Sequence, residues 1–200
     1  MEPSPSVAKL ASERLGLTVY NSFLQELPKD EKGAFDVIAL SDVLEHICEP
    51  AAFLRDASQW LADTGLLYIK VPNGRWNLFK QRVLERLGRC PSQGVWDSYE
   101  HVVHYTDATL ARMLRQAGFE PFLVTIASPV QLPVWERYVG RYYLYPSPWA
   151  LDWPRYLGRT VFYWLSWVER ALRFGSLGWL APDVVMLARK SRPGTEVPRT

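Results

Sequence analysis

The chain of 200 residues is 48% hydrophobic and 22% charged, close to the globular average, which excludes a disordered or fibrous protein. This length is enough for one α/β domain with its own core and too short for two large ones. A net charge of +2, with basic residues that cluster only weakly, gives no reason to expect a nucleic-acid partner. The two cysteines, Cys48 and Cys90, lie far apart and outside any C-x-x-C motif, which argues against a disulfide framework or a metal site and fits a reducing cytoplasm.

The chain starts with a predicted helix rather than with a secretion signal, because no basic region followed by an apolar one stands there. Ser4 is a suitable N-cap, Pro5 suits the first helical position, and Gly16 ends the helix. Residues 17–20 alternate apolar and polar, which predicts a short strand. The predicted helix has one apolar face, formed by Val7, Ala8, Ala11 and Leu15.

The predicted fold is organised around residues 35–46. An apolar run from Phe35 to Leu40, interrupted only by Asp36, changes abruptly to polar residues. This pattern predicts a buried parallel strand. Ligands of open α/β sheets bind at the carboxyl ends of the strands, so we expect the chemistry at residues 41–46.

The next segment predicts a strand–helix–strand unit. Pro50 begins a helix that ends before the turn Asp63-Thr64-Gly65, and residues 66–71 form the next buried strand. Such a unit requires a parallel sheet with a right-handed crossover. After Pro72-Asn73-Gly74, residues 75–100 form an insertion that could be a lid or a substrate wall and could contain a helix over residues 77–87. Its notable side chains are Trp76, Phe79, Arg82, Trp96 and Tyr99.

The second half begins with a helix that Thr106 caps and Gly118 closes, followed by a strand over residues 119–127. From residue 128 to 181 the sequence is aromatic and interrupted by prolines, with a helix predicted from about Tyr156 to Phe174. Residues 183–190 predict the last strand, and residues 191–200 a frayed tail.

Several of these stretches resemble one family. FDVIALSDVLEHICEPAAFL, GLLYIKVPN and EHVVHYTDATLARMLRQAGFE occur in the order typical of class I S-adenosylmethionine-dependent methyltransferases, in particular the small-molecule, type 11 and type 23-like branch. The resemblance covers roughly residues 2–127. It implies a doubly wound, Rossmann-like α/β fold, with a mostly parallel sheet and an antiparallel last strand.

The resemblance also implies a division of the chain. Residues 1–127 would form the methyltransferase core, with the insertion at 75–100, and residues 128–182 an aromatic-rich helical insertion or cap. Residues 183–190 would return to the core. The family places a first strand, a glycine-rich loop, a helix and a second strand before the position of Glu2, and none of the twelve glycines here forms a G-x-G cluster. We expect a fragment, a gene start placed too late, or a degenerate relative.

The same resemblance assigns cofactor contacts. Glu2 matches the acidic residue that binds the ribose hydroxyls of S-adenosylmethionine, and Phe23 and Leu24 would border the adenine. Ser41 and Asp42 lie where the family holds the methionine part. Purely structural roles remain open for two of these residues: Phe23 could be a core residue, and Asp42 could cap a helix or stabilise the turn without binding the cofactor.

Two histidines are candidates for acceptor chemistry. His101 matches the histidine that the family carries before its Y-T segment, and it is the first candidate for a base or a substrate-orienting group. His46 is the second, or else a structural histidine. His101 and His104 are three residues apart but lack an evident third ligand, so we predict no metal site.

The region from 135 to 180 mixes aromatic residues with arginines, which suits a membrane interface or a lipid-linked substrate. The alternatives are a cover over the substrate or a homodimer face. Arg159, Glu169 and Arg170 interrupt the apolar runs, so a membrane-spanning helix is not expected. The sequence thus predicts a cytoplasmic methyltransferase for a small-molecule or lipid- or sugar-type acceptor; its rival is a non-catalytic interaction module.

Overall fold

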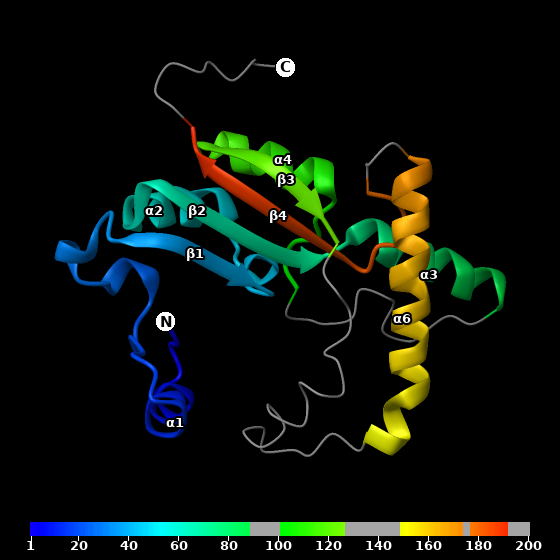
Figure 1. Cartoon of the computed structure of the whole chain (residues 1–200), viewed down its shortest axis with the longest axis horizontal. Coiled ribbons are helices and arrows are strands. Elements are labelled where there is room, and N and C mark those ends of the chain that lie inside the picture. Colours follow the sequence, from blue (N-terminus) through cyan, green and yellow to red (C-terminus); the bar gives the residue numbers. More distant parts are fainter. Residues whose placement is uncertain (89–100, 127–148, 174–176, 192–200) are drawn as a thin grey trace.

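The computed structural model describes residues 1–88, 101–126, 149–173 and 177–191, with the side chains of the long helix α6 from residue 161 onwards. The predicted wall residues Trp96 and Tyr99, all aromatic residues between 135 and 145 and the tail from residue 192 lie outside this part. The elements, shown in Figure 1, are α1 (Pro5–Leu15), β1 (Phe35–Ser41), α2 (Pro50–Trp60), β2 (Leu61–Pro72), α3 (Gly74–Arg86), α4 (Asp107–Gln116), β3 (Phe119–Thr125), α6 (Trp149–Leu172) and β4 (Asp183–Lys190).

The four strands form one sheet in the order β1-β2-β4-β3. β1 runs parallel to β2, whereas β4 runs antiparallel to both of its neighbours, β2 and β3. Three strands therefore share one direction and the last strand opposes them. This confirms the predicted Rossmann-like arrangement, in which the last strand of the chain is inserted between two earlier ones.

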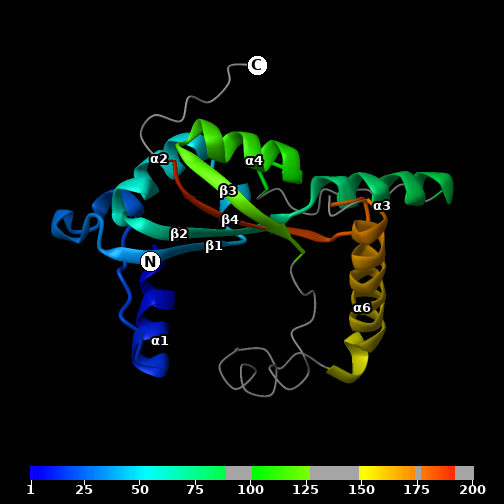
Figure 2. The same cartoon turned by 45° about the horizontal axis from the view of Figure 1, so that its top comes forward.

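The core lies between the sheet and the two helices that cover one of its faces, α2 and α4 (Figure 2). Leu67, Ile69 and Val71 alternate along β2 and are fully buried, because every second side chain of a strand points to the same face. Leu54 of α2 and Leu114 of α4 meet them in the same cluster. The helices α3 and α6 lie beyond the carboxyl ends of β1 and β2, the end of the sheet at which the site is expected (Figures 1 and 2).

Local signals predicted several element boundaries correctly. α1 begins at Pro5 and ends before Gly16, whose φ is +64°. Thr106 caps α4 through a hydrogen bond from the Thr109 amide at 3.2 Å. β4 spans the eight residues expected of it. α6 begins at Trp149, well before the predicted start near Tyr156.

Two predictions about strands are wrong. Residues 17–20 form no strand, and β1 is an edge strand in which Val37 is 56% exposed instead of a buried central strand. Both differences have one cause. A strand needs a neighbour for its backbone groups, and within the described residues β1 pairs with β2 alone.

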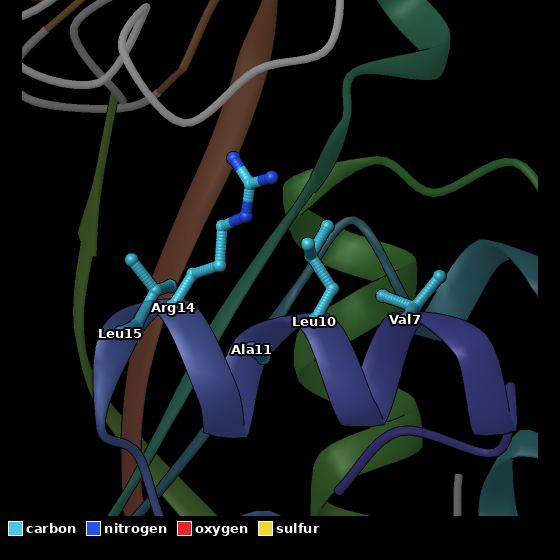
Figure 3. Close-up of a pocket in the computed structure, with 5 residues that line it drawn as sticks. All are labelled: Val7, Leu10, Ala11, Arg14 and Leu15. Carbon is cyan, nitrogen blue, oxygen red and sulfur yellow. The ribbon is translucent and has the colours of Figure 1, made fainter.

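The apolar face of α1 is also less buried than its pattern predicts. Ala8 is buried, but Val7 and Leu15 remain about half exposed, at 48% and 47%. With Leu10, Ala11 and Arg14 they line an open pocket along one face of the helix (Figure 3). The helix thus forms for local reasons, and its apolar face lacks a full tertiary partner in the described part of the chain.

The described helices include none that is both long enough and apolar enough to cross a membrane.

Candidate active site

The turn after β1 is held by an ion pair. Asp42 has a φ of +54°, a conformation that costs free energy for a residue with a Cβ atom. Its amide donates to the Lys70 carbonyl at 2.9 Å, and its Oδ2 lies 2.7 Å from Lys70 Nζ on the neighbouring strand. The Ser41 hydroxyl donates to the same oxygen at 3.2 Å. These bonds hold Ser41 and Asp42 in place at the carboxyl end of β1, where both residues are exposed.

Glu45 occupies the short helical turn Leu44–His46 that follows. Its side chain is buried, and its two carboxylate oxygens have no hydrogen-bond partner within the described residues. Burial raises the pKa of the Glu45 carboxyl, because a charged group loses its hydration there. The Glu45 carbonyl accepts hydrogen bonds from the Val102 and Val103 amides, at 2.8 and 3.1 Å, which draws the histidine-containing segment to this turn.

The two candidate histidines meet beside Glu45. The rings of His46 and His101 are 4.9 Å apart, and one ligand atom each of Glu45, His46 and His101 lies within 4.8 Å of the others. The His104 ring is 6.2 Å from that of His101. Burial, and then the charge of His101, lower the pKa of His104. One carboxylate and two imidazoles can move a proton, and they are also a donor set that suits a divalent metal ion.

The buried residue Tyr105 contacts the turn that carries Glu45 and His46. Its hydroxyl donates to the Leu44 carbonyl at 3.3 Å, and burial raises its pKa to about 12, so the phenol stays neutral. Glu45 falls within the predicted site range 41–46 but is not among the predicted site residues. The available signal was a carboxylate one residue before the candidate base His46, in the turn that follows a strand.

The residues predicted to bind the ribose and the adenine lie in the amino-terminal segment that precedes β1. Glu2 Oε1 accepts a hydrogen bond from the Ser4 amide at 2.8 Å, and the Asn21 side chain donates to the Glu2 carbonyl at 2.8 Å. Phe23 is 62% exposed, so it is not a core residue. Leu24 is buried instead, in a small cluster with Leu27, Ala57 and Trp60.

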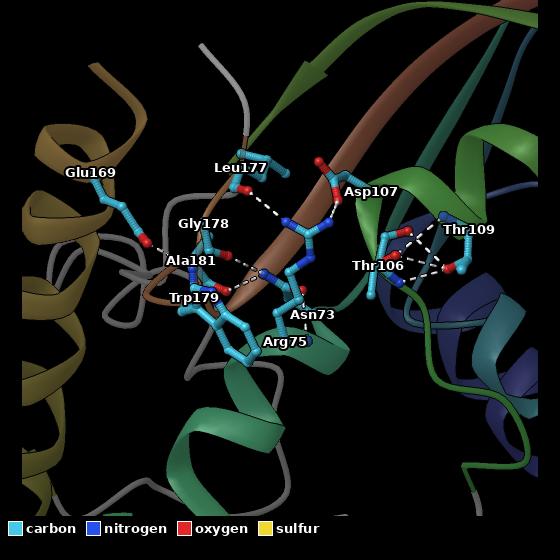
Figure 4. A network of polar contacts seen from close by, with 10 residues as sticks. All are labelled: Asn73, Arg75, Thr106, Asp107, Thr109, Glu169, Leu177, Gly178, Trp179 and Ala181. Atoms are coloured by element: carbon cyan, nitrogen blue, oxygen red, sulfur yellow. Dashed lines mark hydrogen bonds and ion pairs between the residues drawn. The ribbon is translucent and has the colours of Figure 1, made fainter. Parts of the chain in front are cut away.

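A polar network joins α6 and the segment 177–181 to the rim of the sheet (Figure 4). Buried Asn73, directly after β2, donates to the Ala181 carbonyl at 2.8 Å and accepts from the Arg75 amide at 3.0 Å. Arg75 pairs with Asp107 of α4 at 3.3 Å. The Glu169 carboxylate of α6 accepts from two backbone amides, those of Trp179 and Leu180, each at 2.9 Å.

A comparison with known protein families shows to which family the chain belongs. The family model described as a methyltransferase domain matches residues 1–124. The chain belongs to this family. The predicted resemblance is thereby confirmed, and the strand order, with its antiparallel β4, agrees with it.

Curated relatives of this methyltransferase domain include three ubiquinone biosynthesis O-methyltransferases. That of Bordetella avium is 27% identical over 124 residues, which cover 60% of this chain and 50% of the relative. Those of Cereibacter sphaeroides and Xanthomonas euvesicatoria are 29% and 30% identical and cover 58% and 57% of this chain, and 47% and 48% of the relatives. The chain thus spans about half the length of the curated relatives that it matches.

Solved structures agree on the fold. A SAM-dependent methyltransferase from Thermotoga maritima superposes with a TM-score of 0.54 at 20% identity, over 95% of this chain and 72% of its own. A SAM-dependent methyltransferase from Archaeoglobus fulgidus gives 0.52 at 13% identity, over 94% of this chain and 74% of its own.

Proposed function

We propose that this domain transfers a methyl group from S-adenosylmethionine to an oxygen of a small-molecule or lipid- or sugar-type acceptor. The observation that carries the proposal is the Glu45–His46–His101 cluster at the carboxyl end of β1, in a chain of the methyltransferase domain family. The names of the curated relatives favour an oxygen acceptor of the kind used in quinone biosynthesis.

The residues assigned to the cofactor fit it in chemical kind. Glu2 offers a carboxylate for ribose hydroxyls, and the exposed ring of Phe23 offers a face for an adenine. Leu24 is buried, so it would support the adenine side from within the core rather than touch much of it. Ser41 and Asp42 offer an oxygen-rich rim for a charged amino-acid group. The bound cofactor would supply an electrophilic methyl group on a sulfonium.

The histidine cluster would handle the proton of the acceptor. In-line methyl transfer to a hydroxyl leaves one proton to remove, and a neutral imidazole can accept it. We assign this role to His101, with His46 as the orienting neighbour. In its ionised form, the buried Glu45 carboxylate would stabilise the protonated imidazole, because the attraction between opposite charges is strong away from water. Asp42, tied to Lys70, would keep the turn in place.

The first test is calorimetric titration of S-adenosylhomocysteine into the 200-residue chain and into a version extended upstream of Met1. We expect the extended chain to bind, and the 200-residue chain to bind weakly or not at all. Phe23→Ala in the binding form should weaken affinity. Phe122→Ala is the matched control, since Phe122 of β3 is also half exposed but belongs to no candidate site. Equal affinity of both variants would remove Phe23 from the site.

The second test concerns the cluster. His101→Gln should lower the methylation rate of a phenolic acceptor and shift its pH profile, whereas His104→Gln should leave the profile in place. Excess EDTA separates two uses of the same three donors: unchanged rates support proton transfer, and a loss restored by a divalent cation supports a metal ion.

A second candidate function is a non-catalytic interaction module. The observations that favour it are the twelve glycines without a G-x-G cluster and the exposed edge of β1, which could pair with another copy of the chain. Failure of both the 200-residue and the extended chain to bind S-adenosylhomocysteine would support this alternative.

A further inference from the structure

Helix α6 carries an apolar stripe that faces outwards. An amphipathic helix of a globular protein normally turns such a stripe to the core. Here the side chains that face the sheet are different ones: Tyr163 packs against the main core, Ser166 is buried, and Arg170 reaches β3. The exposed side chains follow the spacing i, i+3, i+4, i+7, i+11 of one helical face, and we call them the α6 stripe: Val161, Trp164, Leu165, Val168 and Leu172.

Polar bonds fix this orientation. Arg170 donates to the Val124 carbonyl at 2.8 Å and to the Thr125 hydroxyl at 3.0 Å. The neighbouring Glu169 accepts the two backbone hydrogen bonds of the 179–180 segment. The Phe162 ring meets that of Trp76 on α3 at 4.8 Å. Rotating the helix to bury its stripe would break all of these contacts, so the outward orientation belongs to the folded domain.

The exposed apolar area of the stripe limits which kind of partner can cover it. Trp164 is 63% exposed, Val168 57% and Leu172 77%. Together the five side chains present on the order of 500 Å² of apolar surface, near the upper end for the largest patch of a monomer. A standard protein interface requires about 800 Å² from each partner. The stripe therefore has the size of a functional surface patch and is small for a stable protein dimer.

The net positive charge of the sequence stretch that contains the stripe favours an anionic surface as its partner. Between residues 135 and 173 the sequence has six arginines and three acidic residues. One of those three, Glu169, is engaged by backbone amides, and the stripe itself contains no charge. Tryptophan prefers the boundary between water and lipid, and Trp164 and Trp167 lie on and beside the stripe.

We propose that α6 lies in the interface of a membrane that contains anionic lipids, with its stripe against the acyl chains. A bilayer demands no matching shape, so a single helical stripe is sufficient to bind it. The helix would lie in the plane of the interface. In Figure 1 the helices α3 and α6 stand beyond the carboxyl ends of β1 and β2. The proposal does not depend on methyl transfer.

The test is co-sedimentation of the intact chain with vesicles of phosphatidylcholine alone and of phosphatidylcholine with phosphatidylglycerol. We expect binding to the anionic vesicles that weakens with salt, and a loss of at least about tenfold in Val168→Glu. Trp164→Ser removes an interfacial ring without adding a charge and should weaken binding too. Val7→Glu, on the half-exposed face of α1, is the matched control and should bind like the unchanged chain.

Three outcomes would overturn the proposal. The unchanged chain could stay in the supernatant with anionic vesicles at low salt. Val168→Glu could bind vesicles as well as the unchanged chain does. A concentration-dependent dimer that Val168→Glu dissociates, without vesicle binding, would assign the stripe to a second copy of the chain.

Discussion

Glu169 is predicted to anchor α6 to the rest of the domain, and Glu169→Gln tests this. The carboxylate accepts the amide hydrogens of Trp179 and Leu180, one on each oxygen, at 2.9 Å. It also fills the space above Gly178, where a Cβ atom would lie 1.9 Å from the Glu169 Cδ. The glutamine side chain keeps the shape and one acceptor, but its NH₂ group faces a backbone amide, so one donor loses its partner.

The magnitude follows from this geometry. A hydrogen bond to a charged group contributes about 1.5–3 kcal/mol, and the site is partly exposed, so we expect a cost of about 2 kcal/mol. For a chain of this size that loss lowers the melting temperature by about 4–8 °C. Hydrogen exchange should accelerate in α6 more than in β2, because the anchor is local.

A matched control makes the reasoning refutable. Glu13→Gln is the same chemical change on α1, where Glu13 lies 3.8 Å from Lys9 and both side chains are largely exposed. Exposed pairs of this kind contribute little, so the control should change stability by less than about 0.5 kcal/mol. Thermal unfolding followed by circular dichroism measures both variants. Equal shifts, or no shift for Glu169→Gln, would refute the anchoring role.

Three further predictions concern residues of the site. Leu24→Ala should cost about 2–5 kcal/mol in urea unfolding, whereas Phe23→Ala should cost less than about 0.5 kcal/mol, since only Leu24 is buried; similar costs would contradict this division. Asn73→Ala should cost about 2–4 kcal/mol, because it leaves the Ala181 carbonyl and the Arg75 amide without their buried partner; a change below about 1 kcal/mol would show that water replaces the amide. The folded state raises the pKa of Glu45, so its contribution to stability is full below its ordinary pKa and is lost as the pH rises through the raised value. Glu45→Gln should therefore gain stability relative to the unchanged chain as the pH rises above the ordinary carboxyl pKa, and a pH-independent difference would contradict the burial of a carboxyl group there.

The sequence alone determined the elements whose signals are local. Ser4, Pro5 and Gly16 predict the ends of α1, and Thr106 and Gly118 predict the ends of α4. A cap or a left-handed glycine acts within one turn of the backbone, so its effect does not depend on distant residues. The resemblance carried by three short stretches predicted the family and the antiparallel last strand.

Only the tertiary structure decided which groups meet. His46 and His101 are brought together because the Glu45 carbonyl binds the amides after His101, a contact that no local pattern encodes. The exposure of β1 and the absence of a strand over residues 17–20 depend on which neighbour is present for the backbone groups. The α6 pattern gave a helix with an apolar face, but the bonds of Glu169 and Arg170 set the direction of that face. Periodicity fixes which side chains share a face, whereas contacts between distant segments fix where the face points.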